Sequence, residues 1–291
     1  VYKRQGRALY MGYGTAVRVL TIVFLLVHGL VAQPFVVDDA AIRRSIEQGL
    51  EKFRDEGGFP TADELAKAAK NSPKTTEMLP PAVQTAPGDR TASVFLLGSI
   101  YDCGKCDKWH LGSNATAWCL SEDGLMVTNH HVFARAKGAI MGICDREGNT
   151  WPVTELIASD PVSDLAIFRV KGDGFTPLPL GKPAAIGDKV HVISHPSGTF
   201  FIQTFGEVSR YFNSQRRKEK STWMSITADF AKGSSGGPVL NEDGAVVGVV
   251  SSTKSIYYNS NNGTPEGPLQ MVIKNCVPVS AIDRILGSNR S

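Results

Sequence analysis

Three segments of this chain carry residue types that together could transfer an acyl group. Residues 232–240 read Lys-Gly-Ser-Ser-Gly-Gly-Pro-Val-Leu, with Ser235 set among glycines. Upstream, residues 128–132 read Thr-Asn-His-His-Val, and residues 160–166 read Asp-Pro-Val-Ser-Asp-Leu-Ala. A serine hydroxyl becomes a good nucleophile when an imidazole takes its proton and a carboxylate holds that imidazole. The chain therefore contains the parts of an acyl-transfer triad, in the order His, Asp, Ser.

The order of these parts separates three possible arrangements. Gly233 to Gly237 also satisfies G-x-S-x-G, the nucleophile motif of α/β-hydrolases, but those enzymes need a histidine after the serine. Here all six histidines precede Ser235. The subtilisin order needs an aspartate before the histidine, and an α/β layer pattern that this chain lacks. The chymotrypsin order fits directly, with His131, then Asp164, then Ser235.

The same segments resemble the trypsin-like serine peptidases of the bacterial HtrA/Deg type. The matching patterns are T-N-x-H-V at 128–132, D-x-x-S-D-L-A at 160–166 and G-x-S-G-G-P at 233–238. Three ordered motifs are far more specific than any one of them, and the similarity runs over residues 91–287. The resemblance implies an all-β fold of two antiparallel β-barrels of chymotrypsin type. The resemblance covers the peptidase segment and no PDZ domain, so it does not lead us to expect regulated oligomeric quality control.

The resemblance also implies a role for each residue. His131 would be the general base and acid, Asp164 would hold its imidazole and stabilise the cation, and Ser235 would be the nucleophile. The first barrel would carry His131 and Asp164, and the second would carry Ser235. The backbone N–H groups of Gly233 and Ser235 would form the oxyanion hole.

Three neighbours could take these roles instead: His130, Asp160 and Ser234. The motifs argue against each of them. His130 falls on the variable position of the histidine motif. Leu165-Ala166 must follow the aspartate of its motif, and Gly236-Gly237 must follow the serine.

Residues around the serine motif bear on substrate choice. Asp229 lies six residues before Ser235, the spacing that in trypsin supplies the acidic floor of the primary pocket. A carboxylate there would favour Arg or Lys before the cleaved bond, although loops of the HtrA type differ in length here and Asp229 could instead cap a turn. Val250 and Ser251 are expected near this pocket, on a strand along which the substrate backbone pairs. His195 is expected in a loop near the cleft rather than as a second base.

Composition limits the other functions. The hydrophobic share of 42% and the charged share of 20% are ordinary for a globular protein. A net charge of +3 is too small to argue for nucleic acid, and the basic run at 216–220 is mixed in sign, as expected of a solvated hairpin tip. We expect polypeptide substrates, no nucleic acid and no cofactor.

The N-terminal residues 1–34 predict export. Arg18 precedes the apolar run Val19–Val27, which is too short to span a bilayer comfortably and has its charge on the N-terminal side. A signal peptide is the prediction, and a membrane anchor is the alternative. The chain begins with valine, and Met11 is a credible start. Either reading places the protein outside the cytoplasm, in the periplasm or secreted.

Five cysteines in an exported chain predict disulfides with one thiol left over. Cys119–Cys144 is one possible bridge. Cys103 and Cys106 form a C-x-x-C with His110 and Cys119 close behind, and three cysteines and a histidine could bind zinc. A c-type haem would need a histidine directly after Cys106, where Asp107 stands. We favour disulfide or other structural use over a metal.

The remaining elements follow from hydrophobic periodicity. Two helices are expected before a proline-rich linker that ends near residue 90, the first at 38–56 and the second, opened by a capping box, at 61–70. We predict that this 35–90 segment is a docking or spacer element. Short strands with recurrent turns fill 91–291, which predicts a β-sandwich or a β-barrel rather than βαβ units. The resemblance implies two barrels, divided near 172–186. A mobile surface loop is expected at 259–268 and a closing helix at 279–286.

Three hypotheses for the function remain. The favoured one is an exported serine endopeptidase that works through an acyl-enzyme. The alternative is a catalytically silent peptidase fold kept for binding or as a scaffold. The third is a zinc-binding module centred on Cys103, Cys106 and His110.

Overall fold

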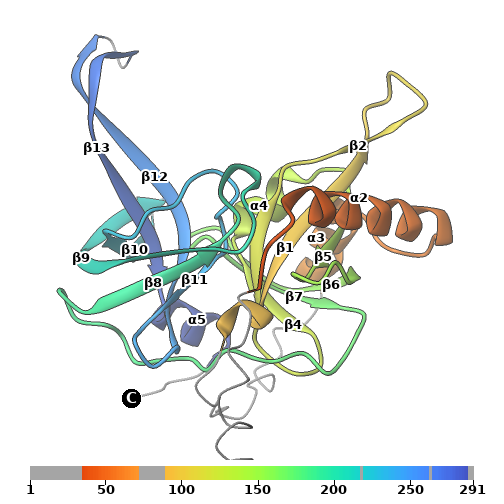
Figure 1. Cartoon of the computed structure of the whole chain (residues 1–291), viewed down its shortest axis with the longest axis horizontal. Coiled ribbons are helices and arrows are strands. Elements are labelled where there is room, and N and C mark those ends of the chain that lie inside the picture. The colour runs from red at the N-terminus through yellow and green to blue at the C-terminus, as the bar shows by residue number, and fades with distance from the viewer. Residues whose placement is uncertain (1–34, 72–88, 217–218, 262–263, 288–291) are drawn as a thin grey trace, which may run out of the picture. The chain divides into compact units, whose positions relative to one another are not determined.

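The computed structural model of the 291-residue chain describes residues 35–71, 89–216, 219–261 and 264–287. Val37–Ser291 form one compact unit, and strands dominate its described part (Figure 1). The expected signal or anchor segment and nearly all of the proline-rich linker lie outside the described residues. Within those residues, no helix has the length and apolar character that crossing a membrane requires.

The first sheet closes on itself. Strand β1 (Val94–Asp102) pairs with β3 (Ala115–Cys119) along one edge and with β5 (Ile140–Cys144) along the other. The ring runs β1-β3-β4-β7-β6-β5, and its other members are β4 (Leu125–Thr128), β6 (Thr150–Asp160) and β7 (Leu165–Val170). The short β2 (Trp109–Leu111) extends β1 as an antiparallel hairpin. Because β1 has a strand on each edge and side chains packed on both faces, it is buried from Val94 to Ile100.

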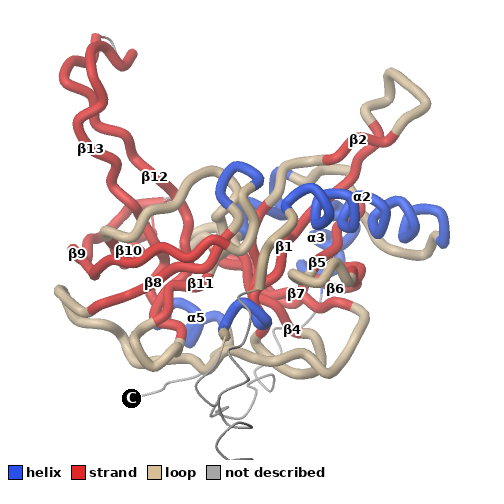
Figure 2. Tube along the Cα trace, in the orientation of Figure 1, coloured by secondary structure: helices blue, strands red, loops and turns tan. Residues whose placement is uncertain are grey.

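The second sheet is a closed barrel in the order β10-β13-β12-β11-β8-β9. Its members are β8 (Lys189–Ser194), β9 (Ile202–Arg216), β10 (Glu219–Ile226), β11 (Pro238–Leu240), β12 (Val246–Asn261) and β13 (Thr264–Pro278). The β12–β13 hairpin continues far beyond the barrel as a two-stranded arm (Figure 2). The predicted all-β fold of two antiparallel barrels is confirmed.

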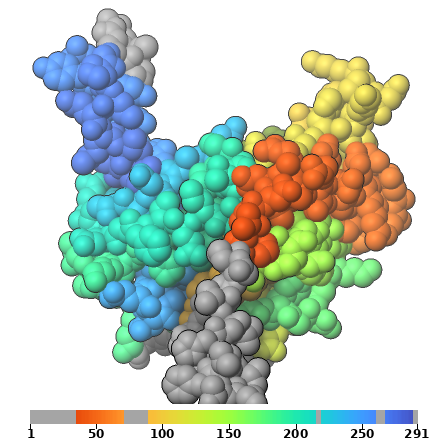
Figure 3. Space-filling model, in the orientation of Figure 1, coloured from red at the N-terminus to blue at the C-terminus, as the bar shows by residue number. Residues whose placement is uncertain are grey.

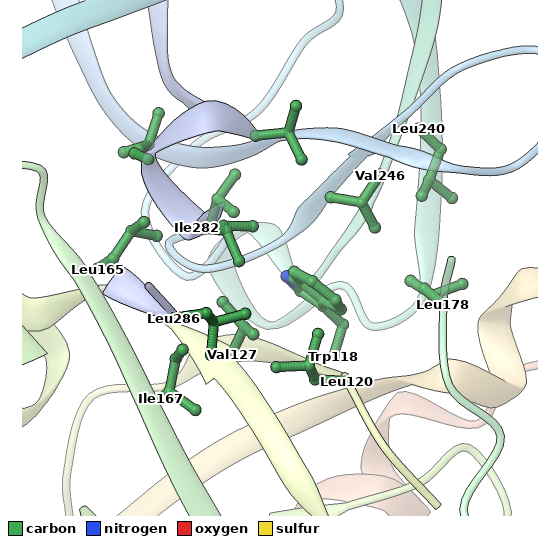
Figure 4. Close-up of a cluster of buried hydrophobic side chains, with 14 of the residues drawn as sticks. Trp118, Leu120, Val127, Leu165, Ile167, Leu178, Leu240, Val246, Ile282 and Leu286 are labelled. Carbon is green, nitrogen blue, oxygen red and sulfur yellow. The ribbon is translucent and has the colours of Figure 1, made fainter. Parts of the chain in front are cut away.

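The barrels share one hydrophobic core. Trp118, Val127 and Ile167 of the first barrel meet Leu240 and Val246 of the second in a single buried cluster (Figure 4). Helix α5 (Ser280–Ile285) closes this cluster with Ile282. Apolar burial is the dominant favourable term in folding, so the shared core fixes one barrel against the other. A cleft between them can therefore keep a defined geometry.

Two N-terminal helices pack on the first barrel. Helix α2 (Asp39–Glu56) buries Ile42, Ile46, Leu50 and Phe53 at helical spacing against residues of β1 and β5. The predicted helix is present, but it is docked on its own chain and does not stand apart as a spacer.

Helix α3 (Ala62–Asn71) begins with the expected capping box. The Glu64 carboxylate accepts the Thr61 N–H at 2.7 Å, and the Thr61 hydroxyl accepts the Glu64 N–H at 3.4 Å.

Three features differ from the sequence prediction. Strands β2 and β6 were not expected, because neither has a clear alternation of apolar and polar residues. The segment 259–268 was expected to be a mobile loop, but Asn259 pairs with Glu266 and Ser260 with Pro265. A backbone ladder needs no apolar side chains, so a polar sequence can extend a hairpin. The basic run lies where β9 turns into β10, with residues 217–218 outside the described part.

All five cysteines are free thiols, so the expected disulfides are absent from the structure. Cys119 packs in the core of the first barrel with Phe95 and Met126. Cys144 packs on the other side of the sheet, in the cluster formed with α2. Since the two side chains belong to different clusters, the bridge considered between them cannot form without rearrangement.

Candidate active site

The three expected triad residues come from three connections that meet between the barrels. His131 lies in the short helix α4 (His130–Arg135), directly after β4. Asp164 lies in the turn between β6 and β7, and Ser235 lies in the loop between β10 and β11. The structure brings these three residues together.

Their side chains form one hydrogen-bonded line. His131 Nε2 lies 3.0 Å from Ser235 Oγ, and His131 Nδ1 lies 3.0 Å from one carboxylate oxygen of Asp164 and 3.1 Å from the other. With the proton on Nδ1, that nitrogen donates to the carboxylate and Nε2 can accept the serine hydroxyl proton. Asp164 is 2% exposed and His131 is 23% exposed, so the imidazole can reach a substrate while its partner stays buried.

Asp164 is held in an unusual backbone conformation. Its φ is 59°, in the left-handed region that residues other than glycine rarely adopt. Asn129 Nδ2 donates to the Asp164 carbonyl at 2.9 Å and fixes this turn. Such strain costs about 1–3 kcal/mol and persists only where the surrounding contacts determine it.

The Asp164 carboxylate is stabilised in its charged form. Burial favours the neutral form, but hydrogen bonds from His131 and from the Ser251 hydroxyl outweigh it and lower the pKa of Asp164. Ser251 was expected at the specificity pocket, and the structure adds this contact with Asp164.

The three alternative residues have other partners. Asp160 accepts hydrogen bonds from the N–H groups of Val162 and Ser163, so it caps the turn that carries Asp164. His130 Nδ1 lies 2.7 Å from the Ser159 hydroxyl. Ser234 is fully buried against Ser194, with 2.9 Å between their hydroxyl oxygens. Each of these contacts serves the loops rather than the cleft.

The loop before Ser235 presents its N–H groups to the cleft. The Lys232 carbonyl accepts the Ser197 N–H at 2.7 Å. In a planar trans peptide the N–H points opposite to the carbonyl, so the Gly233 N–H points away from Ser197. Among the described residues, the backbone N–H groups of Gly233 and Ser235 donate to no backbone carbonyl. Both residues line a cavity, so these donors can reach a bound carbonyl oxygen.

Backbone conformation and close packing require glycine at position 233, and two hydrogen bonds from Thr116 hold the loop. Gly233 has a φ of 100°, and a Cβ there would lie 2.4 Å from the His195 carbonyl oxygen. From the first barrel, Thr116 donates its hydroxyl to the Gly233 carbonyl at 3.0 Å and its N–H to the Ser235 carbonyl at 2.8 Å. Sequence reasoning missed Thr116, because nothing in its own segment distinguishes it.

His195 is structural rather than a second base. Its side chain is fully buried, and Nδ1 accepts the Phe201 N–H at 3.0 Å. Burial lowers the pKa of His195 to about 3, so the ring is neutral at ordinary pH.

Two cavities meet at His131 and Ser235. The larger, of about 510 Å³, is lined largely by the first barrel, and the smaller, of about 300 Å³, is lined by Phe230, Val250 and Ser251. Asp229 lines neither of them. Its side chain is 84% exposed and pairs with Lys274 Nζ at 3.1 Å, so the expected acidic floor is not formed.

Among the described residues, one group of side chains could hold a metal ion, and it lies outside the cleft: Cys103, Cys106 and His110. Hydrogen bonds from the Lys105 N–H and from the Cys106 thiol lower the pKa of the Cys103 thiol to about 7.

Residues 115–249 match the family model of the trypsin-like peptidase domain. A protein of Hahella chejuensis named "probable periplasmic serine endoprotease DegP-like" is 34% identical over 139 residues, which are 47% of this chain and 29% of that protein. The protein of the same name from Ectopseudomonas mendocina is 33% identical over an equal length, with the same coverage of each chain. An uncharacterized protein of Sinorhizobium fredii is 28% identical over 231 residues, 75% of this chain and 34% of its own length. The chain spans about a third of the length of these curated relatives.

The matched region runs from β3 into β12 and contains all three motif segments. The two closed barrels agree with it. Fold, motif order and sequence similarity thus lead to one assignment. Residues 115–249 match the trypsin-like peptidases, and the chain is similar to proteins named as DegP-like serine endoproteases.

Proposed function

We propose that the protein is a serine endopeptidase that uses His131, Asp164 and Ser235. The observation that carries this proposal is the continuous line from the Asp164 carboxylate through the imidazole to Ser235 Oγ. The relatives named as serine endoproteases support the same activity.

The geometry supports a two-step reaction. Ser235 Oγ attacks the peptide carbonyl carbon while His131 Nε2 takes its proton, and the N–H groups of Gly233 and Ser235 stabilise the oxyanion. The protonated imidazole, stabilised by Asp164, then gives the proton to the leaving amine, and an ester to Ser235 remains. Water attacks that ester with its proton passing to His131, which releases the acid and restores the hydroxyl.

The two cavities suggest the substrate class. The smaller cavity shares Arg135 and Lys232 with the larger one. Apart from His131 and the buried Asp164, its other lining side chains are aromatic, apolar or hydroxyl-bearing, which favours an uncharged residue before the cleaved bond. The larger has Arg135, Lys137 and Lys232 on its rim and no acidic lining residue, which favours acidic residues after that bond. A panel of peptides that differ only at these two positions tests both preferences.

Export is also part of the proposal. The relatives are named periplasmic, and the apolar run after Arg18 is typical of an export signal. Fractionation of cells that express the full chain, with immunodetection in each fraction, tests this point.

Labelling of the purified chain with a fluorophosphonate tests the activity. We expect one adduct on Ser235, with no adduct in Ser235→Ala and strongly slowed labelling in His131→Ala. Ser234→Ala is the matched control and should still be labelled at Ser235. A folded chain that is never labelled, and that binds a polypeptide without cleaving it, would instead support the scaffold function.

A further inference from the structure

The β1–β2 hairpin carries three side chains of metal-ligating types near its tip, Cys103 and Cys106 in the loop and His110 in β2. Asp102 pairs with Trp109 and Tyr101 with His110, so the loop 103–108 closes the hairpin. This tip, the yellow arm in Figure 3, projects from the body of the unit. Within the loop 103–108, Cys103 is half-buried and every other residue is exposed. The loop therefore contributes nothing to the hydrophobic cores described above.

The three ligand atoms already converge. Cys103 Sγ lies 3.5 Å from Cys106 Sγ, which lies 3.1 Å from His110 Nε2, and all three atoms lie within 4.8 Å of one another. With Zn–S bonds of about 2.3 Å and a Zn–N bond of about 2.0 Å, a tetrahedral ion needs about 3.8 Å between sulfurs and about 3.5 Å from sulfur to nitrogen. The two measured separations therefore need shifts of only a few tenths of an ångström to accept an ion, and the third atom pair already lies within 4.8 Å.

The backbone holds this arrangement. Gly104 has a φ of 65°, and its N–H donates to the Asp102 carboxylate at 2.7 Å. This tight turn places both thiols on the same side of the loop. On the other side, pairing with Tyr101 and a ring contact of 5.8 Å between centroids fix His110. Ligands placed beforehand lose little entropy when an ion binds.

We propose that Cys103, Cys106 and His110 bind one Zn²⁺ ion, with water in the fourth position. Two thiolates and an imidazole are a ligand set that suits Zn²⁺, and the two thiolate charges balance the ion. A 3.5 Å separation of the sulfurs is far beyond the length of about 2.05 Å of a disulfide bond.

The ion would tie the loop 103–108 to the adjoining residues of β2. Tyr101 and Leu111, from the two strands of this hairpin, line the larger cavity beside Ser235. Bound metal would therefore reduce the motion of one wall of that cavity.

The test uses the full chain with Ser235→Ala, which removes self-cleavage and makes the result independent of the proposed peptidase activity. Reduced protein is mixed with Zn²⁺, dialysed and analysed for metal content. We expect one Zn²⁺ per chain. Three separate variants, Cys103→Ser, Cys106→Ser and His110→Gln, each remove one ligand. Loss of a residue that only hydrogen-bonds to a metal ligand weakens metal affinity by about 10- to 100-fold, so loss of a ligand itself should weaken Zn²⁺ binding by more than that. Asp107→Asn, in the same loop, is the matched control and should bind normally.

Two further readouts are independent of stoichiometry. Co²⁺ in place of Zn²⁺ should give a thiolate charge-transfer band that is lost in both serine variants. Trypsin should cut after Lys105 and Lys108 in the metal-free chain and more slowly with Zn²⁺ bound. The proposal would be overturned if the reduced protein bound no stoichiometric Zn²⁺, or if the three ligand variants still bound it. Loss of Zn²⁺ in Asp107→Asn would also overturn it, because a different set of ligands would then be required.

Discussion

At the scale of single residues, environment rather than residue type decides what each carboxylate does. Asp160 and Asp164 lie in one turn, and both have a pKa below the usual value. Asp160 uses its oxygens to cap the turn, with hydrogen bonds from Val162 and Ser163. Asp164, carried to the cleft by that turn, faces His131. The two residues should therefore fail in different ways when they are neutralised.

We expect Asp164→Asn to lower the rate of fluorophosphonate labelling by about 10³–10⁴, because an amide donates to Nδ1 and favours the wrong imidazole tautomer. The variant should remain folded. Asp160→Asn should instead lower the free energy of unfolding by about 1–3 kcal/mol, because hydrogen bonds to a charged group are lost. Labelling rates and urea denaturation of both variants distinguish the two roles. Equal losses of rate would contradict the assignment of Asp164.

At the scale of elements, helix α2 belongs to the folded unit. Ile46 is fully buried at the centre of the contact with β1. A Cβ on Gly98 of β1 would lie 2.8 Å from the Ile46 side chain, so the glycine allows the helix to approach the sheet. The same helix also contacts the loop that supports the oxyanion donors, because the Asp39 carboxylate accepts the Phe200 N–H at 2.8 Å.

Packing of α2 predicts a loss of stability when its apolar face is cut back. Ile46→Ala should lower the free energy of unfolding by about 2–5 kcal/mol, through lost burial and the cavity left behind. Ile202→Ala, at a position that is 36% exposed, should change it by no more than about 1 kcal/mol. Urea denaturation measures both values. Equal, small effects would show that α2 is a spacer after all.

The second contact of α2 predicts an effect on rate. Asp39→Ala should remove the hydrogen bond from the Phe200 N–H and so make the loop 195–201 more mobile. Because the Ser197 N–H of this loop donates to the Lys232 carbonyl, labelling of Ser235 should become about 10-fold slower. The matched control is Asp38→Ala, which removes the N-cap that accepts the Ala41 N–H but leaves the Phe200 contact in place. Its labelling rate should be unchanged. Similar rates for both variants would exclude this coupling.

At the scale of the whole molecule, buried groups determine how the fold responds to pH. His195 binds a proton in the unfolded chain below about pH 6.5 but in the folded protein only near pH 3, because burial disfavours its cation. The unfolded state thus holds the extra proton between these values, and the folded state loses stability as the pH falls through them. Asp164, with its lowered pKa, adds a further loss below about pH 4.

We therefore expect the free energy of unfolding to fall from pH 6.5 toward pH 4, with up to about 1.4 kcal/mol per pH unit from His195. His195→Asn keeps an acceptor for the Phe201 N–H but cannot titrate, so it should flatten this range and leave the loss below pH 4. His191→Gln, at a half-buried position where burial also lowers the pKa of the imidazole, should retain most of the slope. Urea denaturation at several pH values gives the slopes. An unchanged slope in His195→Asn would exclude His195 as its source.

The sequence by itself determined the class of fold and singled out the three residues that the structure brings together, His131, Asp164 and Ser235. Order and spacing of motifs are properties of the chain, and short strands with recurrent turns permit few folds. The outcome for Asp229 could not be predicted, because its pairing with Lys274 depends on a strand that follows much later in the chain. Three features were decided by the tertiary structure alone. Thr116 and Ser197 hold the loop before Ser235 by hydrogen bonds, and α2 packs on the first barrel. Cys119 and Cys144 lie on opposite sides of one sheet. Contacts between distant segments depend on how the barrels close, and no local pattern records that closure.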